Sequence, residues 1–147
     1  MWVICVTAPR LMFTDAEIEY LSGQRLGRLA TVTAKNEAHV VPTGFRVSDD
    51  HTKIEVGGHN LADRRPLYLR NIESNPLVAF VVDDVASTDP WTPRGVTVRG
   101  RAEIRAAGGE RIGQGFDSTL IVITPASIVS WGIDGPAFGP PNSRKVS

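Results

Sequence analysis

The strongest constraint on the fold is a regular alternation of side chains over residues 95–106. Small or apolar side chains occupy every second position, and polar side chains occupy the positions between them. This period of two predicts a long β-strand with one face in the core and the other towards solvent. The inward positions are Val96, Val98, Gly100, Ala102 and Ile104, and the outward positions are Thr97, Arg99, Arg101, Glu103 and Arg105.

Five more segments have the composition of strands, and short turns link several of them as antiparallel hairpins. The segment at 77–82 is nearly all apolar, so we expect it to be buried on both faces. Six strands suit a small closed barrel, because closure removes exposed edges. The five segments are residues 28–35, 39–47, 52–56, 77–82 and 120–131.

Two segments are predicted to be helical. Thr14 and Glu17 form a capping box ahead of a helix at 15–22. Residues 60–75 read as one inserted helix, with Pro66 in its first turn. We therefore expect a mainly β fold with inserted helices.

The chain divides into three parts along its 147 residues. Residues 1–12 are expected to be an unstructured extension, and residues 13–134 to form one domain. Residues 135–147 are rich in Pro and Gly and are expected to be a mobile tail or an arm on a partner.

The overall composition argues against several classes of partner. Acidic and basic residues number 16 each, so no bulk charge attracts nucleic acid or a membrane surface. No apolar run is long enough to span a membrane, and residues 2–8 lack the features of a signal peptide. The single cysteine, Cys5, fits a reducing compartment. We expect a cytoplasmic protein.

An ordered set of short segments gives the chain a family resemblance. The segments are GRLATV at 27–32, VVPTGF at 40–45, IEVGGH at 54–59, RNI at 70–72, NP at 75–76, VDD at 82–84 and VRGRAE at 98–103. Together they resemble the pyridoxamine 5'-phosphate oxidase-like FMN-binding split-barrel superfamily, and most of all its branch of probable coenzyme F420-dependent flavin/deazaflavin oxidoreductases. The resemblance implies a six-stranded antiparallel split β-barrel, a homodimer, and two equivalent cofactor sites at the dimer interface.

Both cofactors that this resemblance implies, FMN and coenzyme F420, combine a flat ring system with phosphate. Their site needs cations, backbone donors and a flat apolar wall. Arg64 and Arg65 lie near a predicted helix start, where an anion is favoured, and are candidates for the phosphate, although they could also be solvated surface residues. The family commonly has a lysine in this segment, and arginine matches its charge but not its shape.

The remaining candidates for cofactor binding come from one strand and two loops. The strand matches the one beside the ring in relatives, although an edge-strand bulge would also explain its proline. The first loop is rich in glycine and allows close approach of a ligand, or is simply a tight turn. In the second loop, a tryptophan could stack on the ring and an arginine could bind a carboxylate tail, or both could serve packing and solubility. These candidates are Val41, Pro42, Thr43, Gly57, Gly58, His59, Asn60, Trp91 and Arg94.

No hydrolase, metalloprotease or nucleotide-binding loop motif is present in the sequence, and we predict no metal site. A redox cofactor carries its own reactive atom, so no catalytic side chain is assigned. Three hypotheses remain: an F420H2-dependent reductase of a small conjugated or heterocyclic molecule, an FMN-dependent oxidoreductase, and a cofactor- or tetrapyrrole-binding module without turnover.

Overall fold

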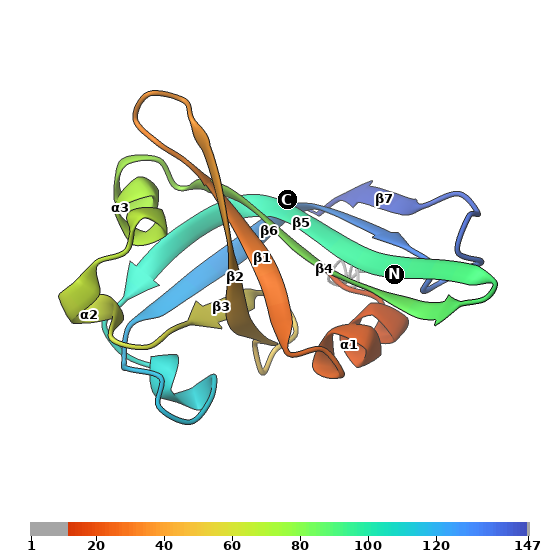
Figure 1. Ribbon diagram of the computed structural model, residues 1–147, viewed down its shortest axis with the longest axis horizontal. Coiled ribbons are helices and arrows are strands. Elements are labelled where there is room, and N and C mark those ends of the chain that lie inside the picture. Colours follow the sequence, from red (N-terminus) through yellow and green to blue (C-terminus); the bar gives the residue numbers. More distant parts are fainter. Residues whose placement is uncertain (1–11, 147) are drawn as a thin grey trace, which may run out of the picture.

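The computed structural model describes residues 12–146, which form a seven-stranded antiparallel sheet with short helices (Figure 1). The strand order is β3-β2-β1-β4-β5-β6-β7, and β3 also pairs with β6. Six strands therefore close into the predicted barrel, and β7 extends the sheet beyond β6. The strands are β1 (Leu26–Val32), β2 (Ala38–Val47), β3 (Ile54–Gly57), β4 (Leu77–Thr88), β5 (Trp91–Arg105), β6 (Leu120–Trp131) and β7 (Asn142–Lys145).

The barrel interior is filled by aliphatic and aromatic side chains from all six strands. Phe80 of β4 meets Phe45 of β2 edge to face, with ring centroids 5.3 Å apart. The ring of Phe80 also lies directly over Gly27, where any Cβ atom would be 2.2 Å from the ring. The fully buried residues include Leu29, Ile54, Val56, Phe80, Ile121, Ile123 and Ile128.

The first helix, α1 (Asp15–Ser22), confirms the sequence prediction. The Thr14 hydroxyl accepts a hydrogen bond from the Glu17 N–H at 3.1 Å, and the Thr14 N–H donates to Glu17 Oε1 at 2.9 Å. This reciprocal pair is the predicted capping box. Glu17 is 0 % exposed, so the cap also places a carboxylate inside the protein.

The single helix predicted at 60–75 is wrong. The structure has two short helices, α2 (Leu61–Arg64) and α3 (Leu67–Ser74). Arg65 between them takes a left-handed conformation with φ 42°, and Pro66 follows it. Proline has no N–H for a helical bond and disfavours a helical conformation in the residue before it, so the helix breaks there.

Strand β4 also differs from its prediction. Its residues alternate between buried and exposed, and Leu77 is 52 % exposed, so the expectation of burial on both faces is wrong. Strands β4 and β5 continue pairing from Asp84–Arg94 to Thr88–Trp91, beyond the last pair of β5 with β6 at Gly95–Trp131. We call residues 84–94 the β4–β5 arm; Figure 1 shows it extending away from the barrel.

The sequence predicts a mobile tail or an arm on a partner for residues 135–147, and within this segment the structure has a strand, β7. Strand β7 pairs with residues 127–130 of β6. Arg144 donates two hydrogen bonds to the buried Glu17 carboxylate, one of them 3.0 Å long, and a third of 2.9 Å to the Met12 carbonyl. A nonlocal ion pair, which composition does not reveal, thus orders the segment. The predictions for residues 1–11, including Cys5, lie outside the described residues.

Candidate functional site

One side of the barrel exposes an apolar sheet surface formed by β2, β1 and β4. In the strand register, Arg28 of β1 lies between Pro42 of β2 and Val81 of β4, and Ala30 lies between Val40 and Ala79. Val40 is 63 % exposed, a high value for a valine in a sheet. We call this surface the outer face. Its residues are Leu26, Arg28, Ala30, Val40, Pro42, Leu77, Ala79 and Val81.

Of the three candidates on β2, only Pro42 lies on the outer face. Val41 packs against the core, and Thr43 is 6 % exposed. The Thr43 hydroxyl is buried and has no hydrogen-bond partner within residues 12–146. Strand β3 pairs only with residues 44–47 of β2, so residues 38–43 have a free edge, where a proline is tolerated. The free edge leaves this strand able to pair with a ligand, whereas the Thr43 hydroxyl is buried on the core side of the strand.

The glycine-rich link after β3 is covered by a loop of the protein itself. A Cβ atom on Gly57 would be 2.8 Å from the Phe116 ring and 2.9 Å from Ile112. His59 Nδ1 lies 2.7 Å from the Gly115 carbonyl oxygen, and the His59 ring meets Phe116 edge-on. Close packing of the loop at 108–119 therefore explains the need for glycine at this position.

The start of α2 already has an anion in contact with it. Asp117 Oδ2 accepts a hydrogen bond of 3.1 Å from the Ala62 N–H, whereas Asn60 makes no side-chain cap. The sequence analysis missed Asp117 and Phe116, because nothing local in the sequence indicates that their loop packs against residues 57–62. An external phosphate cannot take the same N–H unless Asp117 moves.

The two candidate arginines, Arg64 and Arg65, differ in their contacts with the rest of the protein. Arg65 forms an ion pair with Glu73 of α3. Arg64 makes no ion pair within the described part of the chain, and its Nη1 lies 3.5 Å from the His59 carbonyl. Burial raises the pKa of the neighbouring Tyr68, and Arg64 opposes this rise. Arg64 is therefore the arginine that remains available for an anion.

Trp91 and Arg94 lie on the arm, far from the other candidates. Trp91 pairs with Thr88, seven residues along β4 from Val81, and Val81 is separated from Pro42 by Arg28 of β1. At about 3.3 Å per residue, this separation is about 23 Å. Figure 1 shows the tip of the arm and α2 at opposite ends of the molecule. One chain therefore does not bring all the candidate residues together.

At the base of the arm, Arg94 forms a fixed polar cluster with Asp84 and Tyr20. Arg94 Nε and Nη2 donate to the two Asp84 oxygens at 2.7 and 3.0 Å, and the Tyr20 hydroxyl donates to Asp84 Oδ1 at 3.0 Å. The guanidinium also lies 5.0 Å from the centroid of the Tyr20 ring. The hydrogen bonds from Arg94 lower the pKa of Asp84, whereas burial and Asp84 raise that of Tyr20. Asp84 therefore stays ionised and Tyr20 neutral near pH 7.

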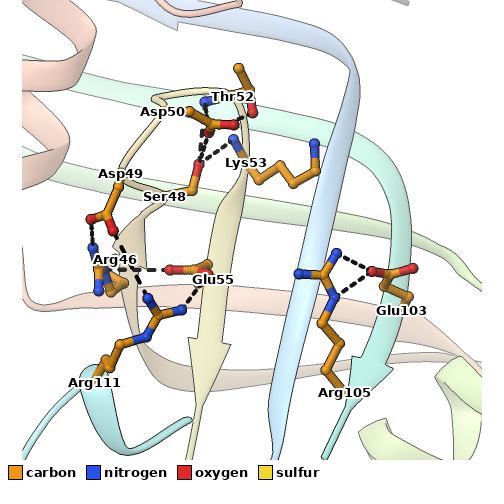
Figure 2. A network of polar contacts seen from close by, with 10 residues as sticks. All are labelled: Arg46, Ser48, Asp49, Asp50, Thr52, Lys53, Glu55, Glu103, Arg105 and Arg111. Carbon is orange, nitrogen blue, oxygen red and sulfur yellow. Dashed lines mark hydrogen bonds and ion pairs between the residues drawn. The ribbon is translucent and has the colours of Figure 1, made fainter. Parts of the chain in front are cut away.

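A second polar cluster, on the outside of β2 and β3, has a structural role (Figure 2). Glu55 is only 6 % exposed, and its carboxylate lies 3.5 Å from both Arg46 Nε and Arg111 Nη2. Asp49 also contacts both arginines, so the charges balance. Because Arg111 comes from the 3₁₀ helix at Gly109–Arg111, this cluster attaches the loop at 108–119 to the barrel.

The described residues contain no group of three His, Cys, Asp or Glu side chains that could hold a metal ion, and no helix suited to spanning a membrane. The family model for pyridoxamine 5'-phosphate oxidase matches residues 13–131, so the chain belongs to that oxidoreductase-related family. The resemblance found in the sequence is thus confirmed.

Individual relatives agree with this placement. The chain is 42 % identical over 123 residues to the 5a,11a-dehydrotetracycline/5a,11a-dehydrooxytetracycline reductase of Streptomyces rimosus, covering 84 % of this chain and 85 % of that protein. A putative pyridoxamine 5'-phosphate oxidase from Corynebacterium glutamicum has a similar structure, with a TM-score of 0.56 at 20 % identity over 80 % of this chain and 88 % of that chain. An FAD-binding protein from Mesorhizobium loti has a TM-score of 0.58 at 18 % identity, over 80 % and 91 %. The two structures share the fold, and the family and the reductase together support an oxidoreductase.

Proposed function

We propose that this protein is an F420H2-dependent reductase that transfers a hydride to a small conjugated molecule. The observation that supports the proposal most directly is the outer face, which offers a flat apolar wall beside the free edge of β2. The reductase from Streptomyces rimosus adds the substrate class, because its name describes a polycyclic dehydrotetracycline as the molecule that is reduced. We infer a similar fused-ring acceptor for this chain.

The residues present fit a cofactor of this kind. Pro42 and its neighbours on the outer face supply the wall, and the free backbone edge of β2 offers hydrogen-bonding groups to the edge of the ring. Arg64 could hold a phosphate, since charge-assisted hydrogen bonds from arginine suit that group. When bound, the deazaflavin supplies the hydride. The protein orients the two rings and excludes water between them.

We also propose that the protein acts as a homodimer. The outer face is too apolar to be left in water, and a twofold axis would let the same surface of a second copy cover it. Such an axis could also bring the arm of one copy over the outer face of the other. Trp91 and Arg94 would then join Pro42, Gly58, His59, Asn60 and Arg64 in a composite site. We further infer that the protein works in the cytoplasm, where a lone cysteine stays reduced.

Titration with F420 and with FMN under anaerobic conditions tests the proposal. The full chain is expected to bind F420 and to oxidise F420H2 when a fused-ring enone is added. Arg64→Ala should weaken F420 binding by about tenfold or more, from the loss of about 1.5–3 kcal/mol in charge-assisted hydrogen bonding. Arg70→Ala, an exposed arginine on α3, is the matched control and should bind normally.

Each other outcome points to a different hypothesis. Tight binding of FMN without binding of F420 would indicate that the cofactor is a flavin and not the deazaflavin. Binding without oxidation of F420H2 across a panel of enones would indicate a module without turnover. If Arg64→Ala and Arg70→Ala bind F420 equally well, the phosphate is not held at Arg64.

A further inference from the structure

A cavity of about 390 Å³ lies between the end of α1, the base of the β4–β5 arm and the end of β6. It is lined by Ala16, Glu19, Tyr20, Gln24, Arg94 and Ile133, among others. Asp84 faces this cluster, whereas the adjacent Asp83 forms an ion pair with Arg28 of the outer face. The cavity is therefore on the other side of the sheet from Pro42 and is separate from the cofactor wall within one chain.

Arg94 lines this cavity with a guanidinium whose donors are only partly used. Two of its three guanidinium nitrogens donate to Asp84, and Nη1 has no hydrogen-bond partner within residues 12–146. Asp84 and the Tyr20 ring fix the plane of the group, so little side-chain entropy is left to lose on binding. Because Asp84 balances the charge of Arg94, the cavity offers a directed N–H rather than a net positive charge.

The remaining polar groups at the cavity are mainly acceptors. Glu19 makes no ion pair in the described part of the chain, and the Gln24 amide nitrogen is 3.4 Å from Asp84, which leaves its oxygen free to accept. The Tyr20 hydroxyl is already donating to Asp84. Ala16 and Ile133 add apolar surface. A donor on one wall and acceptors on another suit a ligand that carries a hydrogen-bond acceptor and, beside it, a hydrogen-bond donor.

We propose that this cavity binds the oxygen-rich edge of the acceptor molecule, a carbonyl oxygen with a hydroxyl or amide N–H beside it. The carbonyl accepts from Arg94 Nη1, and the adjacent O–H or N–H donates to Gln24 or Glu19. Phosphate fits poorly, because Glu19 and Asp84 outweigh the single guanidinium. The link to the acceptor rests on the proposed function: Arg94 is three residues, about 10 Å, from Trp91, which that proposal places over the cofactor.

Amide chemical shifts of the ¹⁵N-labelled full chain test the proposal without any cofactor. Salicylamide is the probe, since its planar ring carries a carboxamide beside a hydroxyl. It is expected to shift the amides of Gly23, Gln24 and Gly132 with saturation, and benzamide, which lacks the hydroxyl, should bind several-fold more weakly. Ala16→Trp, which fills the cavity, and Arg94→Lys, which removes Nη1 but keeps the charge, should both abolish these shifts.

The control is Ala34→Trp, in the exposed turn between β1 and β2, which should bind salicylamide like the wild type. The inference is overturned if Ala16→Trp, shown to be folded by its own spectrum, still binds the probe. It is also overturned if inorganic phosphate binds at these amides more tightly than salicylamide does. Should Ala16→Trp fail to fold, the Arg94→Lys result decides alone.

Activity separates this inference from the proposed function. If both hold, folded Ala16→Trp binds F420 normally but has a several-fold higher KM for the acceptor. If F420 binds and is turned over, but salicylamide shifts no amide at the cavity, the inference fails and the proposed function stands. If salicylamide binds at the cavity and no F420 or FMN binds, the proposed function fails and the link to an acceptor fails with it.

Discussion

Replacing Arg144 by methionine should destabilise the fold strongly and make it gain stability in mild acid. Arg144 pairs with a Glu17 carboxylate that is 0 % exposed, and its own side chain is 22 % exposed. Removing one partner of a buried pair costs about 3–5 kcal/mol, because the other charge is left without compensation. That cost is a large share of the 5–15 kcal/mol that typically stabilises a domain.

The pH dependence follows from the pKa of Glu17. Burial alone would raise this pKa, but hydrogen bonds from Arg144 and from the Thr14 N–H outweigh burial and lower it. In the wild type, the contribution of Glu17 to stability is therefore complete above the unfolded pKa of about 4.3 and is lost as the pH falls through the lower folded value. In Arg144→Met, burial dominates and the pKa of Glu17 rises, so this variant should gain stability as the pH falls from 7 to 5.

Urea unfolding at pH 7 and at pH 5 measures both effects. Glu17→Gln/Arg144→Met removes the buried charge, so it should recover part of the lost stability and show no opposite pH response between 5 and 7. A loss below about 1 kcal/mol in Arg144→Met, or a pH response between 5 and 7 equal to that of the wild type, would refute the reasoning.

Four further changes test other contacts. Gly57→Ala should lower the free energy of unfolding, measured with urea, by about 1–3 kcal/mol, because the added methyl group clashes with Phe116. If the effects of Gly57→Ala and Phe116→Ala are additive in the double variant, the clash is not the cause. Asp117→Ala should cost about 1 kcal/mol by uncapping α2, and an unchanged urea midpoint would argue against the cap. Glu55→Gln should lower the urea midpoint and speed proteolysis in the loop at 108–119, and unchanged cleavage would exclude an anchoring role. Trp91→Phe should remove most of the decrease in protein tryptophan fluorescence that bound F420 causes. A decrease as large as in the wild type would place Trp91 away from the ring.

Features set by neighbouring residues could be predicted from the sequence, whereas contacts between distant segments could not. The capping box of α1 depends on residues three apart, and the alternation in β5 depends on residues two apart, so both patterns are visible in the sequence. Pro66 favours the helix break at Arg65, but the apolar positions on either side of it favour one continuous helix, so the sequence alone does not decide between them.

The candidate site was harder to predict for the same reason. The segments around Pro42 and Gly57 were located through the family resemblance, but Asp117 and Phe116 reach them from about 60 residues further along the chain. Nor does the sequence reveal that Asp84 already binds the guanidinium of Arg94. The contacts of Asp117 and Phe116 depend on the assembled barrel, and the pair of Asp84 and Arg94 depends on the register of the β4–β5 hairpin, so local spacing reveals neither.

The closure of the barrel depends on its shortest strand. Strand β3 has four residues, and only Ile54, Glu55 and Val56 pair with β6. Partial opening of a domain is expected where the fewest hydrogen bonds must break together. The junction of β3 and β6 should therefore separate first during native fluctuations. Gly57 and His59 come directly after the paired residues of β3 in the sequence. Transient separation of β3 from β6 would therefore loosen the glycine-rich link while the rest of the sheet stays intact.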